Sequence, residues 1–163
     1  MSLPVLFSEK QAFQQWHTRV VLAFPPAALI FIACRQIFWH KPWGAPPLSN
    51  GGLVFLAVLL TAVYIRLITV KLVTELRTGE LEVGLRGLWK RRRIPRAEIR
   101  SAKAVTYDPA ADFGGYGIRS SRRGTAYIAR GNRAVELQLA SGQTILIGSQ
   151  NPDELARKLT ADS

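Results

Sequence analysis

Two long apolar segments near the N-terminus constrain the fold of this chain more than any other sequence feature. Residues 20–34 carry no formal charge, and residues 51–70 carry only Arg66. About 20 apolar residues in a helix span a bilayer core of roughly 30 Å, since each residue adds about 1.5 Å. The second segment meets that length, and the first meets it when the apolar residues just beyond Arg35 are included. The sequence therefore predicts two transmembrane helices, with spans at about 18–39 and 51–70.

Residues that favour the membrane interface lie at the ends of these segments. Trp16 and Trp39 bracket the first segment as an aromatic belt would. Arg19, Arg35 and Arg66 lie near segment ends, where their long side chains can extend toward water. All five are predicted interface anchors.

The first helix is expected to begin before its apolar segment. Ser8 is a suitable N-cap, so we predict a helix from about Glu9 to Phe38. Pro25-Pro26 should kink this helix, because proline removes a backbone donor. Residues 1–15 are predicted as an interfacial N-terminal segment, since several of the first residues are apolar. A docking tail for a partner and a frayed terminus stay open as alternatives.

The connection over residues 40–49 is short and rich in Pro and Gly, which predicts an antiparallel helical hairpin over 16–70. Near the hairpin loop the basic residues are Arg35 and Lys41, and more of them lie on the opposite side. Basic residues that flank transmembrane helices are more frequent on the cytoplasmic side, so both termini are predicted to be cytoplasmic. A cleaved signal peptide is disfavoured because no small-x-small site ends the first segment. A buried soluble pair is disfavoured because one modest domain cannot cover two such helices.

Charge is concentrated in the C-terminal part of the chain. The formal net charge is +11, and residues 71–163 hold 17 of the 22 Lys/Arg and 10 of the 11 Asp/Glu. This basic balance favours anionic lipid as a partner and permits nucleic acid. Few aromatic residues are interleaved with the charges, which makes nucleic acid unlikely as a ligand. Cys34 is the only cysteine, so neither an internal disulfide nor a cysteine-based zinc site can form.

From about residue 70 the apolar pattern changes to alternation, which indicates strands. Thr78-Gly79 separates two alternating runs and predicts a hairpin, while Pro95 should end the third strand. A further hairpin is expected around residues 130–132, residues 108–117 are expected to be a loop, and Asn151 should cap a final helix with Glu154 as its capping-box partner. The predicted strands are 72–76, 80–86, 88–94, 100–107, 125–129, 134–140 and 144–149, with a short strand at 118–120.

This order of elements resembles the bacterial pleckstrin-homology-like (PH-like) domains that follow a transmembrane hairpin. The segments that carry the resemblance are 75–85, 94–99, 114–119 and 147–152. It implies a membrane α-helical hairpin followed by an α+β PH-like domain over 71–163. That domain would be a bent antiparallel sheet or partly open barrel of about seven strands with a C-terminal helix. It also implies a multi-pass protein of the bacterial cytoplasmic (inner) membrane, and it transfers no catalytic residue.

The basic run Lys90, Arg91, Arg92 and Arg93 is the sharpest candidate binding feature. Alternate residues of a strand point to opposite faces, so Arg91 and Arg93 should share one face, and Lys90 and Arg92 the other. Two charges cannot lie within a core, and the run is therefore expected at an edge or a bend. Contact with anionic lipid or a partner is one interpretation. A solvated edge that prevents aggregation of sheets is the other.

A second basic group lies around the 108–117 loop and the hairpin expected after it, and it consists of Arg119, Arg122, Arg123, Arg130 and Arg133. Its candidate binding residues are Arg119, Arg122 and Arg123. An anion or an acidic partner is the functional interpretation, and ordinary surface charge is the alternative. No catalytic, metal-binding or cofactor-binding pattern is present in the sequence. We therefore expect a non-enzymatic membrane protein without cofactor, whose domain binds anionic lipid or docks onto a larger membrane complex or homo-oligomer. A membrane-tethered nucleic-acid binder is the alternative, and a membrane enzyme is a third, less favoured one.

Overall fold

The computed structural model of the chain describes residues 4–13, 16–88 and 91–161. The chain forms two compact units: a helical unit within residues 15–69, and a unit that combines residues 1–14 with 70–163. We call the second unit the β-domain. The helical unit is thus an insertion in the sequence of the β-domain.

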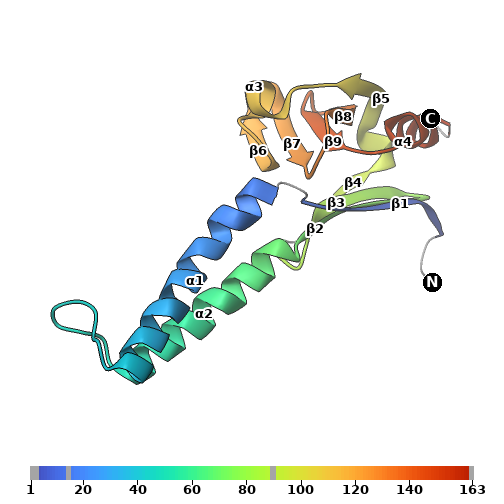
Figure 1. The fold of residues 1–163 in the computed structure, drawn as a ribbon. Helices are drawn as coiled ribbons and strands as arrows, with labels where there is room; N and C mark the ends of the chain where they lie inside the picture. Colours follow the sequence, from blue (N-terminus) through green and yellow to red (C-terminus); the bar gives the residue numbers. More distant parts are fainter. Residues whose placement is uncertain (1–3, 14–15, 89–90, 162–163) are drawn as a thin grey trace. The chain divides into compact units, whose positions relative to one another are not determined.

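The helical unit consists of α1 (Trp16–Trp39) and α2 (Asn50–Ile68), packed as an antiparallel hairpin (Figure 1). At about 1.5 Å per residue, the 24 residues of α1 and the 19 of α2 extend about 36 and 28 Å. Both helices are long and apolar enough to cross a membrane, and most of their surface is exposed. The prediction of two long apolar helices is confirmed.

Small side chains, together with the buried Leu53, contribute to the contact between the two helices. Ala33 of α1 and Ala57 of α2 are buried, which allows the backbones to approach closely. At the loop end, the Gln36 amide donates to the Leu48 carbonyl at 2.7 Å. Ser49 is the N-cap of α2, and its hydroxyl accepts a hydrogen bond from the Gly52 N–H at 3.1 Å.

The prediction of a helix from Glu9 is wrong, because Val5–Ala12 forms strand β1. Phe7 and Gln11 lie on the same face of this strand and are buried, whereas a helix would not keep Phe7, Glu9 and Gln11 together. Residues 4–13 belong to the β-domain. Whether this segment meets the membrane interface stays a prediction. The helix α1 continues through Pro25-Pro26, and the kink expected there is likewise still a prediction.

The first sheet has the order β1-β2-β3-β4, and every neighbouring pair is antiparallel. Its other strands are β2 (Lys71–Arg77), β3 (Glu80–Arg86) and β4 (Arg92–Pro95). The hairpin at Thr78-Gly79 and the end of the third strand at Pro95 are confirmed. The β1 strand is separated from β2 by the whole helical unit and yet pairs with it from Val5 to Ala12.

The second sheet has the order β5-β8-β9-β7-β6. Its strands are β5 (Ile99–Thr106), β6 (Gly117–Ser121), β7 (Gly124–Ile128), β8 (Arg133–Leu139) and β9 (Thr144–Gly148). The predicted hairpin around residues 130–132 is wrong, since β9 lies between β7 and β8 and runs parallel to β7. The connecting residues contact the end of β5 instead, where the Tyr107 N–H donates to the Asn132 carbonyl at 2.9 Å.

Three short helical segments complete the β-domain: the 3₁₀ turn Arg96–Glu98, α3 (Pro109–Phe113) and α4 (Pro152–Thr160). The α3 helix replaces part of the predicted loop, because Asp108 caps its N-terminus and Gly114 ends it at φ 70°. The N-cap of α4 is Asn151, as predicted. The capping-box partner is wrong, since Glu154 pairs with Lys158 at 2.7 Å.

The main core lies between the two sheets and α4, which lies beside β5 and β8 (Figure 1). A smaller apolar cluster on the opposite face of the second sheet is covered by α3 and its flanking residues. The β-domain is therefore α+β, with one antiparallel sheet, one mixed sheet and a C-terminal helix.

Candidate anion-binding surface

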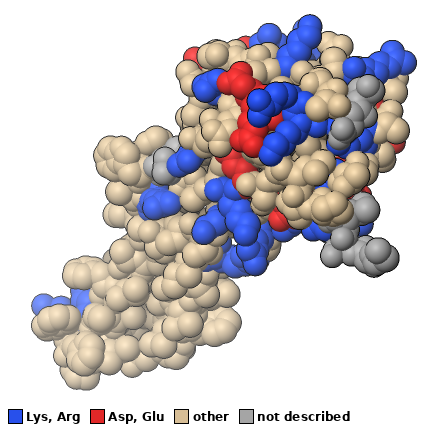
Figure 2. Space-filling view, turned by 90° about the vertical axis from the view of Figure 1, so that its right-hand side faces the viewer, with Lys and Arg blue, Asp and Glu red and all other residues tan. Residues whose placement is uncertain are grey.

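The predicted interface anchors lie at the ends of the two apolar helices. Trp16 and Trp39 are the first and last residues of α1, and both are exposed. Arg19 lies in the first turn of α1, Arg35 lies one turn before its end, and Arg66 lies in the last turn of α2. Figure 2 shows the surface of the helices uncharged along most of its length, with basic side chains toward the ends. This distribution is typical of helices that cross a bilayer.

The outer face of the first sheet carries a network of charged side chains. Glu75 and Glu82 lie directly opposite each other on β2 and β3, which destabilises a sheet unless the charges are neutralised. Arg91 Nη1 donates to both carboxylates, at 3.0 Å to Glu75 and 3.2 Å to Glu82. Arg77 pairs with Glu75 at 3.3 Å, and Arg93 pairs with Glu82 at 2.8 Å. Arg91 and Arg93 are thus engaged within the domain, and their contact with a ligand remains a hypothesis.

Arg92 lies on the opposite face of β4, as the alternation predicts. Ile94 on the same face is in the core, whereas Arg92 is half-buried at its rim. Arg92 Nη2 donates to Gln143 Oε1 at 3.0 Å, which links β4 to the turn between β8 and β9. Because β4 is an edge strand, the predicted edge position of the basic run is confirmed. Lys90 lies outside the described residues.

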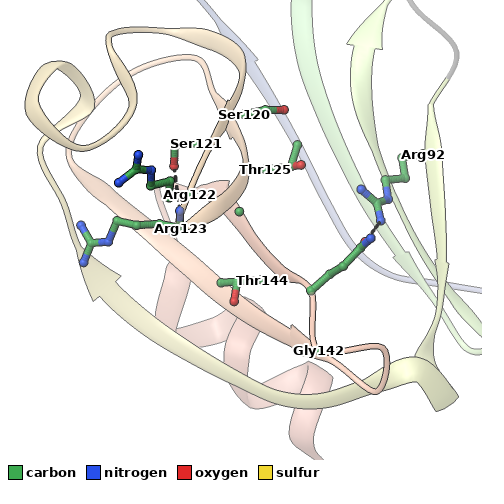
Figure 3. A pocket seen from close by; sticks show the side chains of 10 residues that line it. Arg92, Ser120, Ser121, Arg122, Arg123, Thr125, Gly142 and Thr144 are labelled. Carbon is green, nitrogen blue, oxygen red and sulfur yellow. Dashed lines mark hydrogen bonds between the residues drawn. The ribbon is translucent and has the colours of Figure 1, made fainter.

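Arg92 also lines a pocket with members of the second basic group. The pocket has a volume of about 430 Å³ and is lined by Arg92 of β4, residues 120–125 around the β6–β7 turn, and residues 142–144 of the β8–β9 turn. Figure 3 shows Arg92 on one side and Arg122 and Arg123 on the other. Arg119 lies outside the pocket, and its Nε donates to the Tyr116 carbonyl at 3.0 Å. Of the predicted binding residues, Arg92, Arg122 and Arg123 therefore line one pocket, but Figure 3 shows the side chains of Arg122 and Arg123 extending away from Arg92.

The β6–β7 turn forms one wall of the pocket and approaches β9 closely. Gly124 has φ +121°, and a Cβ atom there would lie 2.1 Å from the Thr144 carbonyl oxygen. Only glycine fits this position, for conformation and for space. The Ser121 hydroxyl accepts a hydrogen bond from the Arg123 N–H at 3.1 Å, and the Arg123 guanidinium pairs with Asp112.

Neutral polar groups complete the pocket. The hydroxyl-bearing residues Ser120, Thr125 and Thr144 lie between the arginines in Figure 3. No pattern in the sequence distinguishes these hydroxyls or Gln143 from other polar residues. The predicted strands 134–140 and 144–149 leave room for the β8–β9 turn, but no local pattern shows that this turn faces β4 across the domain.

The sequence patterns also did not predict that β1 belongs to the domain. Contacts with β9 and α4, near the C-terminal end of the chain, hold this strand in place. The Gln11 side chain is 1% exposed, and its Nε2 donates to the Gly148 carbonyl of β9 at 2.7 Å. Lys158 of α4 donates to the Leu6 carbonyl at 2.9 Å and lies 5.9 Å from the centre of the Phe7 ring. The residues before the hairpin are thus fixed to the same body as the residues after it.

Two ionisable groups elsewhere in the β-domain have shifted pKa values. Burial raises the pKa of the Tyr107 phenol, and the charge of Tyr116 contributes less. A hydrogen bond from Lys158 lowers the pKa of the exposed Glu154 carboxyl. Within residues 4–13, 16–88 and 91–161, no group of three His, Cys, Asp or Glu side chains could hold a metal ion.

No protein-family model matches this sequence, and no curated protein matches it. The arrangement of its own residues is therefore the basis for any functional assignment.

Proposed function

We propose that this chain is a non-enzymatic integral membrane protein whose β-domain is a PH-like binding module at the cytoplasmic face of a bacterial inner membrane. The observation that carries this proposal is the place of the apolar hairpin in the chain. The hairpin is inserted between β1 and β2, which pair up to Ala12 and Lys71. Two membrane crossings return the chain to its starting side, so both ends of the hairpin lead into one sheet. The β-domain is then tethered to the membrane by two links.

The order of strands supports the PH-like assignment. When β6 and β7 are treated as an additional hairpin, the first sheet is followed by β5, β8 and β9 and then by α4. Seven antiparallel strands and a C-terminal helix remain. This is the number of strands that the sequence resemblance implies, but β1 takes the place of the predicted strand 125–129 in the count. In such a domain the sheets are a scaffold, and the turns between strands are available for binding.

Cysteine labelling tests the membrane topology. In a Cys34→Ser background, Ser8→Cys and Ser141→Cys each place one thiol at an exposed site of the β-domain, and Trp43→Cys places one in the hairpin loop. A membrane-impermeant maleimide should label the first two only in inside-out vesicles and the third only in right-side-out vesicles. Labelling of all three from one side would contradict two membrane crossings.

The binding role is tested on the full chain purified from membranes in mild detergent. Mass spectrometry of the protein and lipid content of one sample should find a stoichiometric membrane protein or an enrichment of anionic lipid. A lone monomer with the lipid composition of the bulk membrane would contradict a binding module.

A second candidate function, as the accessory subunit of a membrane complex, is favoured by the surface of the helical unit. Between α1 and α2 lies an apolar groove of about 470 Å³, and small residues such as Ala33, Ala57 and Ala62 contribute to it. Small residues let a neighbouring helix approach closely in a bilayer. Ala62→Leu should fill the groove and remove the complex from a native gel, whereas Val63→Leu, at an exposed site outside the groove, should not. Equal behaviour of the two variants would exclude the groove as a contact.

The nucleic-acid alternative finds less support. Every Phe and Tyr among the described residues of the β-domain is buried or half-buried, so these rings offer no exposed stacking platform.

A further inference from the structure

One end of the first sheet lies next to the apolar hairpin along the chain. The strands β1 and β2 meet at this end, where Ala12 pairs with Lys71, and β3 ends there, where Arg86 pairs with Lys71. Only Thr69 and Val70 separate Lys71 from the last residue of α2. Three steps of chain extend about 11 Å at most. A hairpin that crosses a bilayer therefore keeps this end of the sheet near the lipid headgroups.

The side chains at this end form a basic cluster, which consists of Lys10, Lys71 and Arg86. Lys71 and Arg86 lie directly opposite each other on the outer face of the sheet, and both are exposed. Lys10 is also exposed and lies on the same face, because it precedes Ala12 by two residues on β1. None of the three makes an ion pair with an acidic residue in the described part of the chain. Like charges that face each other destabilise a sheet, so an external anion would stabilise this one.

The acidic pair on the same face is treated differently by the fold. Glu75 and Glu82 also lie directly opposite each other, four residues from the basic cluster along β2 and β3. That separation is about 13 Å at 3.3 Å per residue. Arg91 binds both carboxylates, while Arg77 and Arg93 each pair with one of them. The domain thus neutralises its acidic pair with its own side chains and leaves the basic cluster open to a ligand.

An exposed apolar side chain lies at the same end of the sheet. Leu88 follows Arg86 by two residues, in the turn after β3, and is 47% exposed. Its N–H donates to the Leu85 carbonyl at 3.3 Å, which holds the turn against the end of the strand. Basic groups beside an exposed leucine are typical of surfaces that rest on a bilayer, because the charges meet headgroup phosphates and the apolar chain enters the boundary of the acyl layer.

We propose that this end of the first sheet, formed by Lys10, Lys71, Arg86 and Leu88, is a contact surface for the anionic phospholipids of the membrane that the hairpin crosses. The occupant is the bilayer because the chain itself holds the surface within three residues of a span. This inference rests on the proposed function and deepens it, since it names the ligand of the β-domain and the residues that bind it.

The test follows the depth of residue 88 in the full chain held in nanodiscs. In a Cys34→Ser background, Leu88→Cys carries a nitroxide whose apolar ring takes the place of the leucine. Electron paramagnetic resonance measures its collisions with a water-soluble nickel chelate and with oxygen, which concentrates in the acyl layer. As phosphatidylglycerol replaces phosphatidylcholine, nickel collisions should fall and oxygen collisions should rise. About 0.5 M NaCl should move this transition to a higher phosphatidylglycerol fraction, since salt screens the attraction.

A nitroxide at Lys103→Cys, an exposed site on β5, is the control and should not respond to the lipid. A nitroxide at residue 88 that collides equally often with nickel in both lipids would overturn the contact.

Charge variants locate the contact in the labelled protein. Lys71→Gln and Arg86→Gln should each raise the phosphatidylglycerol fraction at the midpoint about fivefold, the equivalent of about 1 kcal/mol for a basic residue near an anionic surface. Arg100→Gln removes the same charge from an exposed site on β5 and should move the midpoint less than twofold. Equal shifts in all three variants would show a diffuse charge effect and overturn the site.

Melting in a zwitterionic detergent separates lipid binding from structural damage. Lys71→Gln should melt no lower than the unchanged protein, because it removes a repulsion from the sheet. A lower midpoint would show that the protein itself uses this side chain, and would overturn its role in lipid contact. Failure of the contact would leave the thiol labelling of the hairpin unchanged, whereas labelling of all three thiols from one side would contradict the membrane crossings themselves.

Discussion

The Glu9 carboxylate accepts a hydrogen bond from the Ser149 hydroxyl at 2.6 Å, although the two residues are 140 positions apart. The other oxygen of the same carboxylate accepts from the Gln150 N–H at 2.8 Å. Glu9 precedes the helical hairpin, and Ser149 follows the last strand of the β-domain. These bonds, together with the buried bond from Gln11 to Gly148, join the strand before the hairpin to the end of the second sheet.

Replacing Glu9 should destabilise the β-domain. Glu9→Ala leaves the Ser149 hydroxyl and the Gln150 N–H without their acceptor, at a cost of about 2 kcal/mol. The midpoint of thermal unfolding in detergent should fall by several degrees. Lys10→Ser, at an exposed neighbouring site, is the control and should leave the midpoint unchanged. If the two variants melt alike, the contact contributes nothing to stability.

Removal of the hairpin should leave a folded domain only if β1 is kept. We expect residues 70–163 alone to lack a cooperative melt, because β2 loses its partner strand and the core loses Phe7. Residues 4–13 joined to 70–163 by a short Gly-Ser linker should melt cooperatively, since Ala12 pairs with Lys71 and the gap is small. Circular dichroism of both proteins makes the comparison. Cooperative melting of 70–163 would show that β1 is dispensable.

Arg91 should stabilise the first sheet because its guanidinium binds and neutralises two carboxylates that lie opposite each other on β2 and β3. Arg91→Ala leaves Glu75 and Glu82 opposed and should cost about 1–3 kcal/mol, since Glu82 is nearly buried. Adding Glu82→Gln should recover part of the loss, because it removes the repulsion. Urea titration of the single and double variants measures the coupling. A double variant less stable than Arg91→Ala would refute this role. Arg93→Ala, at a more exposed site, should cost less.

Local patterns predicted most strands of this chain and missed the connections between distant segments. Thr78-Gly79 and Pro95 mark a turn and a strand end through their own backbone preferences, so a single sequence suffices. Strand β1 is different, because the alternation of Phe7, Glu9 and Gln11 is short and lies next to a strong helical segment. Its partner β2 begins at Lys71, and 58 residues separate Lys71 from Ala12. The spacing of neighbouring residues therefore cannot predict that these two strands pair.

The same limit applies to the candidate site. The alternation of the basic run predicted that Arg92 would lie opposite Arg91 and Arg93, which the contacts of these residues bear out. Its proximity to the β6–β7 turn depends on how two sheets pack. The crossing of β7 to a parallel position beside β9 brings that turn next to Thr144, and no turn signal in the sequence encodes this crossing.

The two glycines that border the pocket should respond differently to substitution. Gly124→Ala introduces both an unfavourable φ and a clash with the Thr144 carbonyl, whereas Gly142 has φ +82° and open space around its Cβ position. Gly142→Ala should cost about 1–2 kcal/mol from conformation alone, and Gly124→Ala should cost clearly more. Thermal melting of both variants separates the two effects. Equal losses would mean that the turn moves away from β9 to relieve the clash.

The buried Tyr107 phenol should make the β-domain less stable at alkaline pH. Its folded-state pKa is raised by burial, so the proton is held more tightly in the folded than in the unfolded protein. The resulting stability is complete below the ordinary tyrosine pKa of about 10 and is lost as pH rises further, by about 1.4 kcal/mol at pH 11. Tyr107→Phe keeps the ring beside Phe113 and removes the ionisable group.

The free energy of unfolding is measured by urea titration at pH 9 and pH 11. Between these pH values it should fall by about 1.4 kcal/mol less for Tyr107→Phe than for the unchanged protein. Thr106→Ser, an exposed change on the same strand, should keep the full alkaline loss. A Tyr107→Phe variant that loses stability in parallel with the unchanged protein would show that another group controls the alkaline limb, and that the phenol ionises equally well in the folded and unfolded chains.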